Sequence, residues 1–197
     1  MSLALETSPV CSTAFKEWAG VCHALGTGRQ VLIVRKGGIA EVGGRFHPEH
    51  SQFWLYPTYV HQAEQGLKPG TDQLVPPETG FVEIRYLAEV QWIEHVIDDR
   101  QLAHFDAEHV WTTETIAKRF NYRTPGIWLL CVRIFEVGEP YLIPVLPEYL
   151  GCHTWVSLCQ DLRTQPSSPV CDDATFALRS AHLQKLINMG DDFCALA

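Results

Sequence analysis

Residues 81–93 have the sequence Phe81-Val-Glu-Ile-Arg-Tyr-Leu-Ala-Glu-Val-Gln-Trp-Ile93, in which apolar and polar side chains alternate. The apolar set that runs from Val82 to Trp92 falls on one face, and most of the charged side chains fall on the other. Alternation with a period of two is typical of a strand that buries one face. We therefore predict a long half-buried strand over this stretch, bent or bulged along its length.

Apolar runs at residues 30–35 and 126–137 predict two more strands. The aromatic segment 53–60 is interrupted by Pro57. Proline cannot donate to a sheet ladder, so this segment is expected to be an edge strand or an extended loop. The loop at 65–80 has glycine, proline and aspartate but no period, which is typical of a surface connection.

Helical spacing of apolar residues, with capping residues before them, predicts three helices. They cover residues 13–25, 112–120 and 172–190. The count is about three helices and four to six strands without regular βα alternation. This pattern favours an α+β fold, with a curved, mostly antiparallel sheet or small β-barrel and about three flanking helices.

The chain has 197 residues, a formal net charge of −8 and 46% hydrophobic residues. This length predicts a single domain over 1–197, with an N-terminal tail at 1–12 and a linker at 164–170 before the last helix. The net negative charge does not favour non-specific binding to the phosphate backbone of nucleic acids. We expect no membrane span, no signal peptide and, from seven cysteines in an odd set, a cytoplasmic location.

The densest group of chemically versatile side chains lies between residues 35 and 62. It contains Arg35, Lys36, Glu41, Arg45, His47, Glu49, His50, Tyr56, Thr58, Tyr59 and His61. Two cations at the end of a strand, beside the Gly37-Gly38 pair, suit an anion or phosphate. Solvated charges at a strand end explain them equally well.

Three other patterns suggest chemistry without settling it. His47-Pro-Glu-His50 has metal-ligand spacing, but Pro48 disrupts the helix that usually presents such pairs, so we assign no metal and no cofactor. Glu83-Ile-Arg85, with Asp72 upstream, offers a nuclease-like set, although the wet face of a strand is the simpler explanation. Cys152-His153 are neighbours on an extended segment and point to opposite faces, which disfavours a nucleophilic dyad.

Four long strings stand out as a set: Phe15-Lys-Glu-Trp-Ala19, Gln30-Val-Leu-Ile-Val-Arg-Lys-Gly-Gly-Ile39, Phe53-Trp-Leu-Tyr-Pro-Thr-Tyr-Val-His-Gln62 and Leu146-Pro-Glu-Tyr-Leu-Gly-Cys-His-Thr-Trp-Val156. Together they resemble an uncharacterised prokaryotic family, catalogued as domain of unknown function 1802. The resemblance implies no established activity. Some members are associated with a restriction-endonuclease domain, which implies a link to restriction–modification. Separately, a helix followed by Gly-x-Gly-Arg and a strand ending in arginine is similar, in fold alone, to RNA- and modified-base-binding domains of the PUA and ASCH type.

The family motif positions and the dense segment together select the expected ligand-binding residues: Arg35, Lys36, Gly37, Gly38, Glu41, His50, Tyr56, Thr58 and His61. The first hypothesis is a binding module for a nucleotide or modified nucleobase, in which cations meet phosphate and Trp54, Tyr56 or Tyr59 stacks a base. The second is a metal-dependent hydrolase or nuclease using His50 or His61 with Glu41. The third is a protein–protein scaffold without a small ligand.

One geometric expectation separates these hypotheses. Lys36 and Glu41 should face one cleft, with His50 or His61 on its other wall. The sequence leaves open whether the chain is an enzyme, whether it has a protein partner or a nucleic-acid partner, and what its oligomeric state is.

Overall fold

The computed structural model describes residues 9–36, 50–61, 64–71, 74–76, 80–151 and 153–191. In chain order its elements are β1 (Val10–Trp18), α1 (Ala19–Gly26), β2 (Leu32–Arg35), β3 (Gln52–Thr58), β4 (Phe81–Val96), η3 (Asp99–Glu108), α2 (Thr113–Asn121), β5 (Ile127–Pro144), η4 (Pro147–Tyr149), β6 (Trp155–Arg163), β7 (Ser167–Pro169) and α3 (Asp173–Asp191). The elements η3 and η4 are 3-10 helices.

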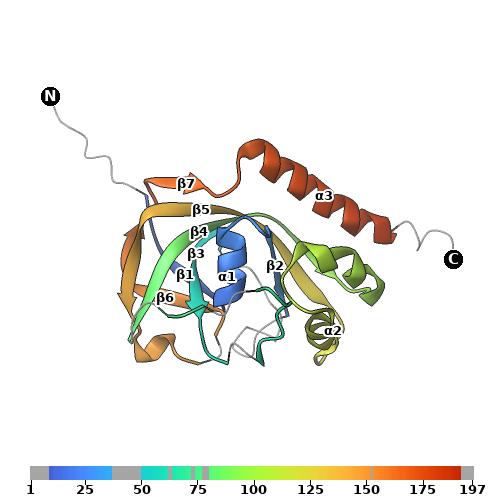
Figure 1. The fold of residues 1–197 in the computed structure, drawn as a ribbon, viewed down its shortest axis with the longest axis horizontal. Coiled ribbons are helices and arrows are strands. Elements are labelled where there is room, and N and C mark those ends of the chain that lie inside the picture. The colour runs from blue at the N-terminus through green and yellow to red at the C-terminus, as the bar shows by residue number, and fades with distance from the viewer. Residues whose placement is uncertain are drawn as a thin grey trace.

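The strands of this described part form one seven-stranded sheet in the order β2-β5-β4-β3-β1-β6, with β7 paired to β5. Strands β1 and β3 run parallel, and the other recorded pairs are antiparallel. The sheet curves around α1, while α2 lies at one end and α3 crosses the outside of β5 (Figure 1). The predicted α+β fold with a curved, mostly antiparallel sheet is therefore confirmed.

Strand β4 contains the predicted long strand and continues to Val96. Its pairing with β5 shifts between Ile84 and Tyr86, and again between Val90 and Trp92, so the predicted bulging is confirmed. After the first shift Leu87 is buried and Tyr86 is only partly covered. Each bulge bends the strand and increases its twist, which helps the sheet to close around α1.

The predicted helix over 13–25 is wrong in its first half, because residues up to Trp18 form β1 and the helix begins at Ala19. Ala14 and Phe15 are fully buried, and both pair with β3 on one side and β6 on the other. A strand covered on both faces carries consecutive apolar residues and loses the period of two. Its apolar positions therefore matched helical spacing.

Strand β3 is an interior strand, which corrects the expected edge strand or loop at 53–60. Pro57 is compatible with this place because β3 pairs with β4 only over Gln52, Phe53 and Trp54. Beyond Trp54 the partner is β1 alone, in the register that sets Glu17 opposite Pro57. The proline therefore lies where only one neighbour is paired.

The chain around the expected tail and linker is more ordered than composition indicated. Val10 and Cys11 pair with Arg163 and Leu162, so the sheet includes residues of the expected tail at 1–12. Within the expected linker at 164–170, residues Ser167–Pro169 form β7 and pair with β5. Proline and serine are tolerated there because β7 is a short edge strand.

The predicted starts of α2 and α3 are confirmed by their caps. The Thr112 hydroxyl accepts from the backbone N–H of Thr115 at 3.3 Å, and Asp172 accepts from the N–H of Thr175 at 2.9 Å. Both bonds satisfy a backbone donor that the first turn leaves without a helical partner. Among the described helices, none is both long enough and apolar enough to cross a membrane.

Candidate functional site

A large cleft opens where the parallel strands β1 and β3 end side by side. Its volume is about 650 Å³, which lies within the usual range of small-molecule sites. Strands β1, β2 and β3 each contribute their last residues, among them Glu17, Arg35 and Thr58. The loop from η4 to β6 adds Tyr149 and Thr154. Residues far apart in sequence, from interior strands and from an edge strand of the sheet, therefore meet in one cleft.

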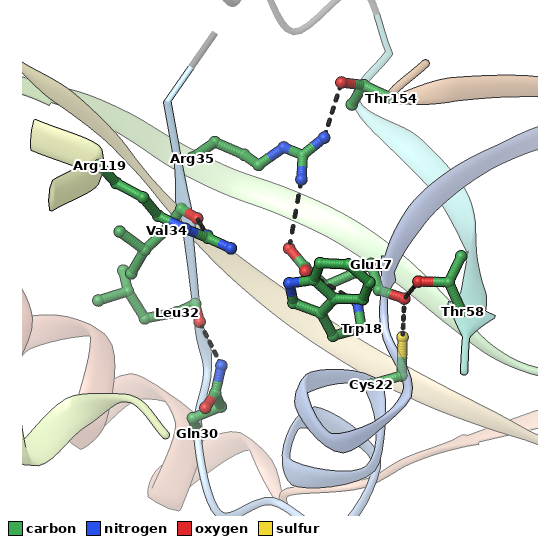
Figure 2. A network of polar contacts seen from close by, with 10 residues as sticks. All are labelled: Glu17, Trp18, Cys22, Gln30, Leu32, Val34, Arg35, Thr58, Arg119 and Thr154. Carbon is green, nitrogen blue, oxygen red and sulfur yellow. Dashed lines mark hydrogen bonds and ion pairs between the residues drawn. The ribbon is translucent and has the colours of Figure 1, made fainter. Parts of the chain in front are cut away.

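Glu17 lies on the floor of this cleft, and its side chain is 1% exposed. The carboxyl Oε1 accepts from the backbone N–H of Trp18 at 2.8 Å. The backbone carbonyl of Glu17 accepts from the Thr58 hydroxyl at 3.1 Å and from the Cys22 thiol at 3.8 Å. These contacts fix the residue where β1 turns into α1 (Figure 2).

The second carboxyl oxygen, Oε2, has no hydrogen-bond donor among the described residues. Arg35 Nη1 lies 3.7 Å away, which forms an ion pair but is too long for a hydrogen bond. A buried acceptor that lacks a donor costs about 1–3 kcal/mol. The floor therefore presents an acceptor that a bound molecule can satisfy.

Arg35 is held from three sides. Its Nη2 donates to the Thr154 hydroxyl at 2.7 Å, its guanidinium lies 5.0 Å from the centre of the Phe15 ring, and Nη1 faces Glu17. A guanidinium has five N–H donors in a fixed planar fork. Figure 2 shows it between Thr154 and Glu17, so donors and an acceptor lie next to each other on the floor.

Arg119 of α2 adds a second buried cation behind this pair. Its guanidinium lies 3.6 Å from the centre of the Trp111 ring, and Nη1 donates to the carbonyl of Val34 at 3.5 Å. Burial, only partly offset by the charge of Glu17, lowers the pKa of Arg119 to about 10. The group remains charged at neutral pH and balances the acid on the floor.

The mouth of the cleft is apolar and aromatic. Val60, Phe81, Tyr122 and Leu150 are between 39% and 61% exposed, and all four line the cleft. Exposed apolar side chains gathered around one opening indicate a surface that contacts something other than water. The cleft thus combines a polar floor with an apolar rim.

The wall formed by the η4–β6 loop is attached to β1. Lys16 Nζ donates to the carbonyls of Tyr149 at 2.5 Å and Gly151 at 2.9 Å. The Tyr149 hydroxyl accepts from the backbone N–H of Cys159 at 2.6 Å, and its ring meets Tyr56 edge to face at 6.0 Å. Burial raises the pKa of Tyr149 to about 12, so its hydroxyl stays protonated.

Three of the residues selected from the sequence lie in this cleft: Arg35, Tyr56 and Thr58. Tyr59, one of the expected stacking residues, lines it too. Trp54 is fully buried and donates its indole N–H to the carbonyl of Cys11, so it is not available to stack a ligand. Gly37, Gly38 and Glu41 lie outside the described residues.

Lys36 is directed away from the cleft. Its ammonium donates to the carbonyls of Phe120 at 3.1 Å and Gly126 at 2.7 Å, and to that of Thr124. Lysine at this position binds the carbonyl end of α2, where orphan acceptors and the helix dipole favour a cation. Burial lowers the pKa of Lys36. The expected cleft shared by Lys36 and Glu41 cannot be traced, because Glu41 lies outside the described residues.

The two selected histidines lie apart from the cleft lining. The His50 ring packs edge to face on Trp155 at 5.0 Å. His61 is largely exposed and its Nδ1 lies 3.7 Å from Glu64. Within the described ranges no three histidine, cysteine or acidic side chains form a group that could hold a metal ion. His47, Asp72 and Cys152 fall outside those ranges.

Glu83 and Arg85, the nuclease-like pair, line a smaller cavity of about 130 Å³ next to α1. Arg85 contacts Glu83 at 2.8 Å and Glu136 at 3.3 Å, across the β4–β5 pair. Arg85 and the two glutamates are partly exposed, which is typical of charged pairs on the solvent-facing side of a sheet. The ion pair thus has a structural explanation.

Sequence reasoning missed Glu17, Thr154 and Tyr149 as cleft residues. The predicted helix over 13–25 includes Glu17, whereas in β1 this residue lies two positions after Phe15 and is buried like it. A buried strand ending in an acid, directly before a helix, is the signal that would have identified it.

Comparison with known proteins gives a family but no activity. The family described as Domain of unknown function (DUF1802) matches residues 14–182. No curated protein matches the chain. The solved structure of ASCH from Zymomonas mobilis is 11% identical with a TM-score of 0.42, covering 89% of this chain and 93% of that one. A mutant of the same protein gives the same identity and score, with 90% and 94% covered. Such values are too low to support an inference about ligand or activity.

Proposed function

The chain belongs to the family described as Domain of unknown function (DUF1802), and we propose that it is a binding module for a nucleotide or modified nucleobase, held in the β1–β3 cleft. The observation that carries the proposal is a cleft floor on which the half-buried donor Arg35 lies beside the buried acceptor Glu17, with aromatic side chains in the walls. Nucleobases are planar heterocycles whose edges carry both donors and acceptors.

The walls suit a flat ring. Tyr59 and Tyr122 line the cleft and are not fully buried, whereas Tyr56 and Tyr149 pack against each other. Arg123 already lies 5.2 Å from the centre of the Tyr122 ring, so Tyr59 is the better stacking surface. Stacking of a base on an aromatic side chain is worth about 1–3 kcal/mol and tolerates any base. Tyrosine stacking supplies affinity and the polar floor supplies orientation.

The first test is a thermal-shift panel of nucleobases, nucleosides and nucleotides, including methylated and hydroxymethylated bases. Modified bases belong in the panel because the family resemblance implies a restriction–modification role. A ligand present at about 100 times its Kd adds about 2.7 kcal/mol of stability. For a chain of this length that raises Tm by roughly 5–10 °C.

Two arginine variants make the test specific. Arg35→Met removes the guanidinium from the cleft floor, whereas Arg85→Met removes one from the partly exposed ion pair with Glu83. We expect the ligand-induced shift to vanish in Arg35→Met and to persist in Arg85→Met. A panel in which no compound raises Tm would overturn the proposal, and so would an unchanged shift in a folded Arg35→Met protein.

A further inference from the structure

We infer that the cleft reads the base-pairing edge of its ligand through Glu17, so that it takes an unpaired base carrying an N–H donor on that edge. This inference rests on the proposed function and specifies the class of ligand. It starts from a polar group on the cleft floor that has no hydrogen-bond partner in the described part of the chain.

Glu17 Oε2 is this group, and its position is imposed by the surrounding structure. Oε1 is bound to the Trp18 N–H, and the backbone carbonyl of Glu17 is bound by the Thr58 hydroxyl and the Cys22 thiol. The residue cannot rotate toward another donor without breaking at least one of these contacts. Among the described residues no donor reaches Oε2, so this oxygen is open to a donor on a molecule that enters the cleft.

The neighbouring donor is equally fixed. Arg35 Nη2 is bound to Thr154, and Nη1 lies 3.7 Å from Glu17 Oε2. A carboxylate can only accept and a guanidinium can only donate. A ligand that satisfies both must present a donor and an acceptor side by side.

Nucleobases present such a pair on the edge that forms base pairs. Uracil and guanine have a ring N–H beside a carbonyl, while cytosine and adenine have an amino group beside a ring nitrogen. In a duplex these groups are already paired. The floor therefore recognises a free base, a nucleoside or a base in an unpaired strand, and rejects a base whose edge donor is blocked.

The ligands themselves provide a test that needs no variant. Uridine, guanosine, cytidine and adenosine are titrated next to 3-methyluridine, 1,N2,N2-trimethylguanosine, N4,N4-dimethylcytidine and N6,N6-dimethyladenosine by calorimetry. Each derivative lacks the edge donor. We expect the parent that binds to do so at least about tenfold more tightly than its derivative, because the derivative leaves a buried acceptor unpaired. For uridine, 5-methyluridine is the matched control, since its methyl group lies on the opposite edge, and it should bind like uridine.

Glu17→Gln tests the residue. The amide O can still accept from Trp18, which turns the amide N–H₂ toward the ligand and removes the acceptor. We expect the preference for parent over derivative to fall toward one, whereas Glu83→Gln, in the other cavity, leaves it unchanged.

The outcomes separate the two proposals. Parent and derivative binding equally tightly would overturn the edge-reading inference and leave the binding module standing. Binding by none of the nucleosides or nucleotides would overturn the proposed function itself. If Glu17→Gln does not fold, the comparison of 3-methyluridine with 5-methyluridine on the unaltered chain still decides the inference when uridine binds, and the other parent–derivative pairs decide it otherwise.

Discussion

Replacing Lys36 with methionine should destabilise the chain without affecting ligand binding. Lys36 places one ammonium on three carbonyls at the end of α2, those of Phe120, Thr124 and Gly126. Hydrogen bonds from charged donors are worth about 1.5–3 kcal/mol each when buried, but water replaces part of them at a partly exposed site. We expect a net loss of about 2 kcal/mol, which lowers Tm by roughly 4–8 °C for a chain of this length.

Urea denaturation and the thermal-shift panel measure the two quantities on the same protein. Lys118→Met is the matched control, because Lys118 lies on α2 itself, is largely exposed and forms an exposed ion pair with Glu114. That variant should change stability far less. If Lys36→Met kept the stability of the unaltered chain and lost the ligand-induced shift, Lys36 would be a ligand-binding cation and its assignment to the end of α2 would be wrong.

Three further predictions concern other parts of the molecule. Burial and, to a smaller extent, Lys68 lower the pKa of His109 to about 4, below its ordinary 6.5. As pH falls, the imidazole of His109 is therefore protonated in the unfolded chain before it is protonated in the folded one. The free energy of unfolding should be about 2 kcal/mol lower at pH 5 than at pH 6.5, and His109→Gln should largely remove this difference. Gly26→Ala should lower the free energy of unfolding by about 1–3 kcal/mol, because a Cβ there would lie 2.1 Å from the Tyr86 ring. Gly138→Ala is the control, since nothing lies within 4 Å of a Cβ at that position, and equal melting temperatures for the two variants would contradict the prediction. A nucleoside and its 5′-monophosphate should bind with similar affinity in calorimetry, and a large gain from the phosphate would show that a cation of the cleft is available to it.

The sequence was most informative where one face of an element meets water. The alternation in β4 predicted a long bulged strand, and the threonine and aspartate caps predicted the starts of α2 and α3. It was misleading where both faces are covered. Strand β1 contains Ala14 and Phe15 in succession, both fully buried, and this arrangement hides the period of two.

The cleft could be predicted only in part for a related reason. Its lining includes residues 17, 35, 58 and 154. The parallel pairing of β1 with β3 places Glu17 near Thr58, and the antiparallel pairing of β1 with β6 places the end of β1 near Thr154. Local sequence selected Arg35, Tyr56 and Thr58 because they share one segment. No local pattern places Glu17 and Thr154 around the same arginine, because that arrangement depends on strand order.

The use of cations in and around the cleft argues for a neutral ring rather than a phosphate as the group that reaches the floor. Lys16 donates to two loop carbonyls and Lys36 to the end of α2, so both ammonium groups are engaged by the backbone. Arg35 shares its charge with Glu17, and burying a phosphate beside that carboxylate would place two anions together at high cost. A base edge meets the same two residues with complementary hydrogen bonds and no net charge. Any phosphate of the ligand is then expected at the mouth, where water solvates it, and the floor distinguishes ligands by where their N–H groups lie.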